Sequence, residues 1–134
     1  MPLFDFSNDP RAKVDRIRKR TLKMIMEASK SSYPSEFAAF LRAEEGVIRE
    51  LVLLPGTVSG GSHAIFRMSM LPVDFTIVGT VHSHPSPVSL PSDADLELFR
   101  KYGWVHMITR APYEVDCWNA YSGRGEMIDL KVVD

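Results

Sequence analysis

Residues 78–95 decide the fold, and they read Val78-Gly-Thr-Val-His-Ser-His-Pro-Ser-Pro-Val-Ser-Leu-Pro-Ser-Asp-Ala-Asp95. The apolar and β-branched residues before His82 are typical of a strand that is buried on both faces. Because a strand projects residues i and i+2 to the same side, His82 and His84 are expected to point together at its C-terminal end. Pro85 and Pro87 then end the strand.

A helix is predicted directly after this turn, over residues 93–102, with Ser92 as its N-cap. The helix has an apolar stripe made of Leu98, Phe99 and Tyr102. At about 100° per residue, Asp95 falls within that stripe, and Ser92 lies one turn earlier. A carboxylate on a buried face is costly unless it is paired or holds a metal ion.

His82, His84 and Asp95 therefore form a candidate metal site. Two imidazoles and one carboxylate suit Zn²⁺ and leave a fourth position for water, which is typical of a catalytic site. Each part alone carries little weight, because His-x-His is often coincidental and Ser-x-x-Asp is a common capping box. Their combination at this spacing favours the metal site.

The same residues carry a family resemblance. His82-Ser-His-Pro85, six further residues and Ser92-Asp-Ala-Asp95 resemble the signature of the JAMM (MPN+) metalloprotease family. The resemblance covers roughly residues 13–134, and the short chain resembles the minimal archaeal and bacterial JAMM proteins. It implies an α/β (α+β) MPN fold, a curved and mostly antiparallel sheet flanked by helices, akin to the cytidine deaminases. Deaminase chemistry itself is set aside, because its His-x-Glu and Pro-Cys-x-x-Cys elements are missing from the sequence.

The resemblance also implies roles for individual residues. His82, His84 and Asp95 are expected to hold a catalytic Zn²⁺ with a bound water, and Glu36 to act as the general base. Composition does not single out Glu36, which is one of eight glutamates. Ser92 is expected to donate a hydrogen bond to the oxyanion.

The reaction that the resemblance implies is cleavage of a peptide or isopeptide bond at the C-terminal tail of a ubiquitin-like or sulfur-carrier protein. Residues 59–70 are expected to contact the tail, and without a long insertion here selectivity for ubiquitin stays open. Processing of a sulfur-carrier precursor uses the same chemistry. A non-catalytic MPN scaffold would also carry this fold, and a RadC-type domain shares both motifs. The intact ligand set argues against the scaffold.

Composition limits the remaining options. The chain has 134 residues, 45% hydrophobic and 25% charged, which is ordinary for one soluble domain, placed here at 13–134 after an extension at 1–12. A net charge of −1 gives no reason to expect nucleic acid or an anionic membrane as a partner. A single cysteine, Cys117, suits the cytoplasm and is expected to be structural, within a strand. A homodimer is compatible with the sequence.

The other elements follow from local patterns. Residues 11–23 carry seven basic residues and one Asp, which indicates either a nucleic-acid arm or, as the interleaved apolar residues favour, the solvated start of a helix. His106 is expected to be a core histidine and His63 to be exposed. A helix is predicted over 18–32, and strands over 13–16, 35–43, 47–54, 64–70, 104–109, 114–121 and 126–133.

Overall fold

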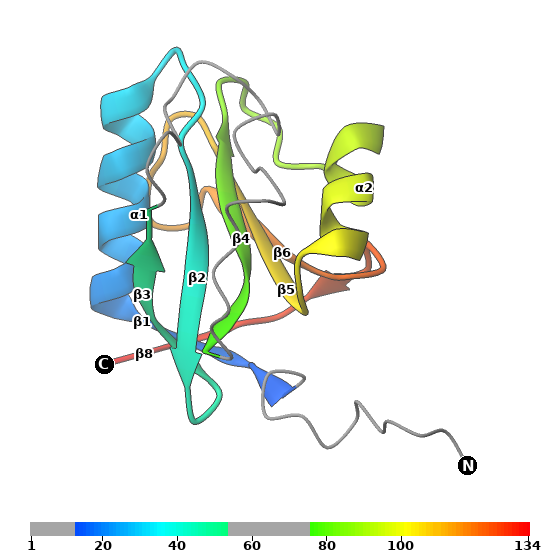
Figure 1. The fold of residues 1–134 in the computed structure, drawn as a ribbon. Helices are drawn as coiled ribbons and strands as arrows, with labels where there is room; N and C mark the ends of the chain where they lie inside the picture. The colour runs from blue at the N-terminus through cyan, green and yellow to red at the C-terminus, as the bar shows by residue number, and fades with distance from the viewer. Residues whose placement is uncertain (1–12, 54–75) are drawn as a thin grey trace.

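The computed structural model describes residues 13–53 and 76–134. Two helices and eight strands are described there (Figure 1). In chain order they are β1 (Arg16–Arg18), α1 (Lys19–Ser32), β2 (Ala38–Glu44), β3 (Val47–Val52), β4 (Ile77–His84), α2 (Asp93–Lys101), β5 (Val105–Arg110), β6 (Trp118–Ser122), β7 (Met127–Ile128) and β8 (Lys131–Val133).

The eight strands form one mixed sheet in the order β7-β6-β5-β4-β2-β3-β1-β8. Four of its pairings are antiparallel, and three are parallel, namely β1 with β3, β1 with β8 and β4 with β5. Helix α1 lies on one side of the sheet and α2 on the other (Figure 1). The predicted α+β class is confirmed, with one helix after the first strand and one after the His-x-His strand.

Each face of the sheet has its own apolar core because alternate strand residues point to opposite faces. On β2, Ala39 and Leu41 join the cluster that contains Leu22 and Ile25 of α1. Phe40 joins the other cluster, which contains Leu98 and Phe99 of α2, Tyr102 directly after that helix, and Ile108 and Tyr121. The apolar stripe predicted for α2 is therefore the face that it buries.

Strand β4 lies near the centre of the sheet, between β2 and β5, and all of its residues except His84 are buried. Gly79 permits its close approach to β5, because a Cβ atom there would lie 1.5 Å from the Val105 carbonyl oxygen. This contact fixes a parallel register in which His82 is opposite Ile108 and His84 is opposite Arg110. The register thereby fixes the positions of both histidines, at the end of β4, relative to β5.

Several predicted boundaries are wrong. The first strand is Arg16–Arg18 and not 13–16, and the strand predicted over 35–43 begins only at Ala38. Residues 114–117 form a turn, in which the Cys117 N–H donates to the Glu114 carbonyl at 2.9 Å, so Cys117 is buried but precedes β6. The strand predicted over 126–133 is two strands, because β7 pairs with β6 whereas β8 pairs with β1.

The extension at 1–12, the loop with His63 and the edge strand predicted over 64–70 lie outside the described residues. Within the described ranges, neither helix is long and apolar enough to cross a membrane.

Candidate metal centre

The structure brings His82, His84 and Asp95 together, as the sequence predicts. One ligand atom from each lies within 4.8 Å of the others. His82 Nε2 is 3.1 Å from Asp95 Oδ1, and His84 Nε2 is 3.1 Å from Asp95 Oδ2. Two ligands held about 2.0–2.1 Å from a tetrahedral ion are roughly 3.3 Å apart, so the three side chains fit one small cation.

The ring nitrogens of the two histidines also fit a metal centre. His84 Nδ1 lies 3.1 Å from the Val88 carbonyl oxygen and donates its proton there, which directs Nε2 toward Asp95. Both ring nitrogens of His82 are buried and make no hydrogen bond to the described part of the chain. His82 Nε2 is buried and close to the Asp95 carboxylate, but it is not aligned for a hydrogen bond. A cation shared by the two groups would explain this arrangement.

Electrostatics keep this cluster charged. Burial disfavours ionisation of Asp95, but its interactions with the His82 and His84 rings outweigh burial and hold the pKa of Asp95 well below its usual range. Burial also opposes the cation of His84, yet its bonds to Asp95 and the Val88 carbonyl raise the pKa of His84. Because histidine binds a metal ion only in its neutral form, the raised pKa of His84 means that metal binding should strengthen as the pH rises.

Asp95 is fixed by the start of α2. Its backbone N–H donates to Ser92 Oγ at 3.1 Å, and its Oδ2 accepts from the Ser92 N–H at 2.9 Å. This is the capping box that the Ser-x-x-Asp pattern predicts. Because Asp95 is only 4% exposed, the cap holds its carboxylate on the buried face of α2, directed at the histidines.

Glu36 precedes β2 by two residues and is half-buried. The β2–β4 register pairs Ala38 with His82, and two hydrogen bonds between Phe37 and Ser83 continue this pairing, with N–O distances of 2.9 and 2.7 Å. Two residues further on, Glu36 falls opposite His84, on the histidine side of the sheet. The carboxylate also acts electrostatically on His84. Glu36 thus lies beside the cluster, although outside the strand where the sequence placed it.

The Ser83 side chain serves β2 and not the cluster. It is fully buried, and its Oγ accepts the Phe37 N–H. Ser83 therefore points to the opposite side of β4 from the two histidines and has a structural role.

Sequence reasoning missed the residues that hold the loop after β4. The Tyr113 hydroxyl donates to the His84 carbonyl at 2.7 Å, and the Tyr121 hydroxyl donates to the Ser89 carbonyl at 2.7 Å. Arg110 Nη1 donates to Ser89 Oγ at 3.0 Å. All three come from β5, β6 or the turn between them, and no local pattern connects them to residues 84–89.

His106 is a core histidine, as predicted. It is fully buried, its ring stacks on Phe99 with centroids 4.4 Å apart, and its Nδ1 lies 2.7 Å from Thr80 Oγ1. Burial lowers the pKa of His106 to about 3, so the ring is neutral. His106 is not part of the metal cluster.

The comparisons agree with this fold and site. The model of the family described as prokaryotic homologs of the JAB domain matches residues 18–121, and the chain belongs to this family. A Haloferax volcanii protein named "Probable metalloprotease" is 41% identical over 123 residues, which cover 84% of this chain and 76% of that protein.

Solved structures give the same answer. A JAB1/MPN domain protein from Archaeoglobus fulgidus is 37% identical, with a TM-score of 0.71 over 90% of this chain and 97% of its own. A structure described as "JAMM: A Metalloprotease-like Zinc Site in the Proteasome and Signalosome" is also 37% identical, with a TM-score of 0.73 over 90% of this chain and 99% of its own. The chain is therefore a member of the JAMM/MPN metalloprotease-like family, with a His-His-Asp cluster that could hold a metal ion.

Proposed function

We propose that this protein is a zinc-dependent peptidase or isopeptidase that cleaves at the C-terminal tail of a ubiquitin-like or sulfur-carrier protein. The observation that carries the proposal is the convergence of His82, His84 and Asp95 beside Glu36. Three protein ligands leave one coordination position open, which distinguishes a catalytic zinc site from a structural one. The relatives in the metalloprotease-like family support the same chemistry.

His82, His84 and Asp95 would hold the ion. When bound, zinc supplies Lewis acidity and lowers the pKa of a water molecule to about 7. The Glu36 carboxylate accepts the proton of the attacking water and returns it to the leaving amine. Ser92 Oγ accepts the Asp95 N–H at 3.1 Å, and its own proton is donated to the oxyanion of the scissile carbonyl.

The test separates the base from the ligands by measuring kcat beside zinc content. Glu36→Gln should keep the zinc and lose roughly 10²–10⁴-fold in kcat, because an amide of nearly the same shape cannot accept the proton. Ser92→Ala should also keep the zinc and lose about 10²–10³-fold, with about 1 kcal/mol lost from the helix cap. Glu44→Gln, which changes an exposed carboxylate, is the matched control. Near-normal turnover in Glu36→Gln would place the base elsewhere.

The substrate is tested with a panel of ubiquitin-like and sulfur-carrier proteins, each as a linear C-terminal fusion and as a lysine conjugate. Cleavage should stop after long incubation with a strong chelator and return with zinc. It should also survive thiol alkylation, because Cys117 is buried and outside the cluster. A panel left uncut by zinc-loaded protein would favour a non-catalytic scaffold.

A further inference from the structure

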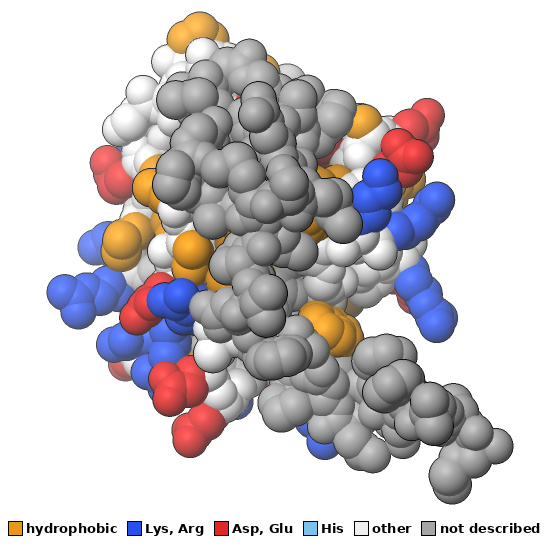
Figure 2. Space-filling view, viewed as in Figure 1, with side chains coloured by type: hydrophobic (Ala, Val, Ile, Leu, Met, Phe, Trp, Pro, Cys, Tyr) orange, Lys and Arg blue, Asp and Glu red, His pale blue; other side chains and the backbone are white. Residues whose placement is uncertain are grey.

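A second surface lies on the α1 face of the sheet, opposite the face that carries the metal cluster. Helix α1 contains four basic residues and one acidic residue, although the whole chain has a net charge of −1. Lys and Arg side chains gather along the edge of the molecule where α1 lies (Figure 2). Helix α1 therefore carries a local excess of positive charge in a chain that is nearly neutral overall.

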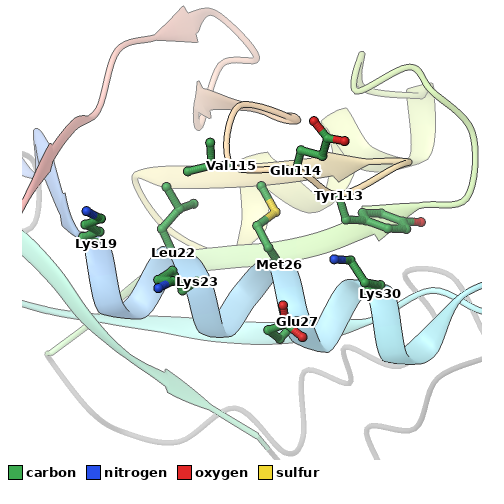
Figure 3. Close-up of a pocket in the computed structure, with 9 residues that line it drawn as sticks. All are labelled: Lys19, Leu22, Lys23, Met26, Glu27, Lys30, Tyr113, Glu114 and Val115. Atoms are coloured by element: carbon green, nitrogen blue, oxygen red, sulfur yellow. The ribbon is translucent and has the colours of Figure 1, made fainter.

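A groove of about 230 Å³ runs between α1 and the turn after β5. Leu22 and Met26 point from α1 toward the turn, where exposed Val115 faces them (Figure 3). The other lining residues are Lys19, Lys23, Glu27, Lys30, Tyr113 and Glu114. The groove thus combines an apolar floor with a mainly basic rim, and Val115 leaves 64% of its surface to solvent.

The three rim lysines are available to a ligand. Lys19, Lys23 and Lys30 are exposed and lie along the same stretch of α1, at i, i+4 and i+11. No ion pair in residues 13–53 or 76–134 involves any of them. Basic side chains without acidic partners, beside exposed apolar surface, complement an anionic ligand that also carries an apolar group.

We infer that this groove binds an acidic polypeptide segment that places an apolar side chain against Leu22, Met26 and Val115. A peptide fits the groove better than a nucleic acid does for two reasons. Glu27 and Glu114 on the rim would repel a continuous line of phosphates, whereas a peptide can space its carboxylates around them. The floor is aliphatic, and single-stranded nucleic acids are held mainly by exposed aromatic rings, whereas Tyr113 is buried.

The groove ends near the metal cluster. Tyr113 closes it at the Lys30 end (Figure 3), and the Tyr113 hydroxyl is bonded to the His84 carbonyl. An acidic segment seated here would therefore be separated from the backbone of His84, at the end of β4, by the Tyr113 side chain alone. The surface belongs to a docking site on the protein and not to the catalytic cluster itself.

The experiment measures binding and needs no cleavage, so its result is independent of the proposed protease activity. The probe is a fluorescein-labelled twelve-residue peptide of Glu and Asp with one central Leu, titrated by fluorescence anisotropy with metal-free and zinc-loaded protein. Controls are the same peptide with Gln for Leu and a twelve-nucleotide oligo(dT). Binding of the acidic Leu peptide should weaken as salt rises from 50 to 300 mM.

Two substitutions within the groove should change the affinity for the acidic Leu peptide in opposite directions. Lys23→Glu should weaken binding roughly tenfold, whereas Glu27→Lys, one turn away, should tighten it roughly fivefold, because each substitution changes exposed charge by two units at short range. Val115→Ser should weaken the Leu peptide several-fold and leave the Gln peptide unchanged. Arg20→Glu, on the same helix but outside the groove, is the matched control and should change binding less than twofold.

Three results would overturn the inference. The first is no measurable binding of the acidic Leu peptide, and the second is an equal loss in Arg20→Glu and Lys23→Glu, which would indicate charge alone. The third is tighter binding of oligo(dT) through the same lysines, which would assign the groove to nucleic acid.

Discussion

The histidines of β4 and β5 lie on the same face of the sheet in different surroundings. His82 and His84 stand at the end of β4, where the capped start of α2 presents Asp95 to both rings. His106 is paired with Thr80, two residues before His82, and it meets the Phe99 ring and a hydroxyl in place of a carboxylate. The role of a histidine on these two strands therefore depends on the group of α2 that its ring meets, and not on its strand position alone.

Asp95→Ala gives the largest expected effect on this contrast. Removing the carboxylate from the cluster should abolish stoichiometric metal binding and activity together, because two neutral imidazoles alone hold a divalent ion weakly. Elemental analysis of purified protein, beside a cleavage assay, measures both. Asp93→Ala is the control, since Asp93 is an exposed carboxylate in the same helical turn. Full metal occupancy in Asp95→Ala would contradict the site.

His106→Asn, unlike Asp95→Ala, should leave the metal bound. It should instead change the pH dependence of stability. The folded protein holds His106 with a pKa of about 3, against roughly 6.5 in an unfolded chain. Below about pH 6.5 the unfolded chain therefore binds the proton more readily, and the free energy of unfolding falls as the pH drops toward 3.

Between pH 7 and pH 5, one such histidine accounts for about 2 kcal/mol of that fall. Urea denaturation of the metal-free proteins at both pH values measures it, and His106→Asn should lose about 2 kcal/mol less than the unmodified protein. Equal losses would mean that His106 is not held neutral by the fold.

Tyr113→Phe should have the smallest effect. It removes the hydroxyl that donates to the His84 carbonyl and leaves the packing of the ring in place. We expect a loss of about 1 kcal/mol in stability and a few-fold weaker metal affinity, since one hydrogen bond supports the ligand loop. Tyr33→Phe, at the exposed ring that contacts Tyr113 edge-on, should change neither. Comparable losses of stability and metal affinity in both variants would contradict the role of the Tyr113 hydroxyl in holding the loop after β4.

The ligand set could be predicted because its signals are local. The apolar run before His82, the prolines after it and the capping box at Ser92 are each signals from neighbouring residues, and together they indicate where β4 ends and where α2 begins. The resemblance to JAMM proteins then directed attention to Glu36, which no local pattern distinguishes.

What could not be predicted depends on pairings between distant parts of the chain. The residues of β7 and β8 read as one strand, yet β8 joins β1 at the opposite edge of the sheet. Val115 and Cys117 favour a strand by propensity, but the turn at 114–117 overrides it. The support of the ligand loop by Arg110, Tyr113 and Tyr121 likewise exists only once β5 and β6 are placed beside β4.

The capping box has a consequence for exchange of the ion. Asp95 is already oriented by Ser92, and His84 by the Val88 carbonyl, through bonds that do not involve a cation. Demetallation should therefore leave Asp95 and His84 in place, and the stripped protein should refill without refolding. We then expect the rate of uptake to be limited by the loss of water from the incoming cation, with little contribution from ordering of the chain.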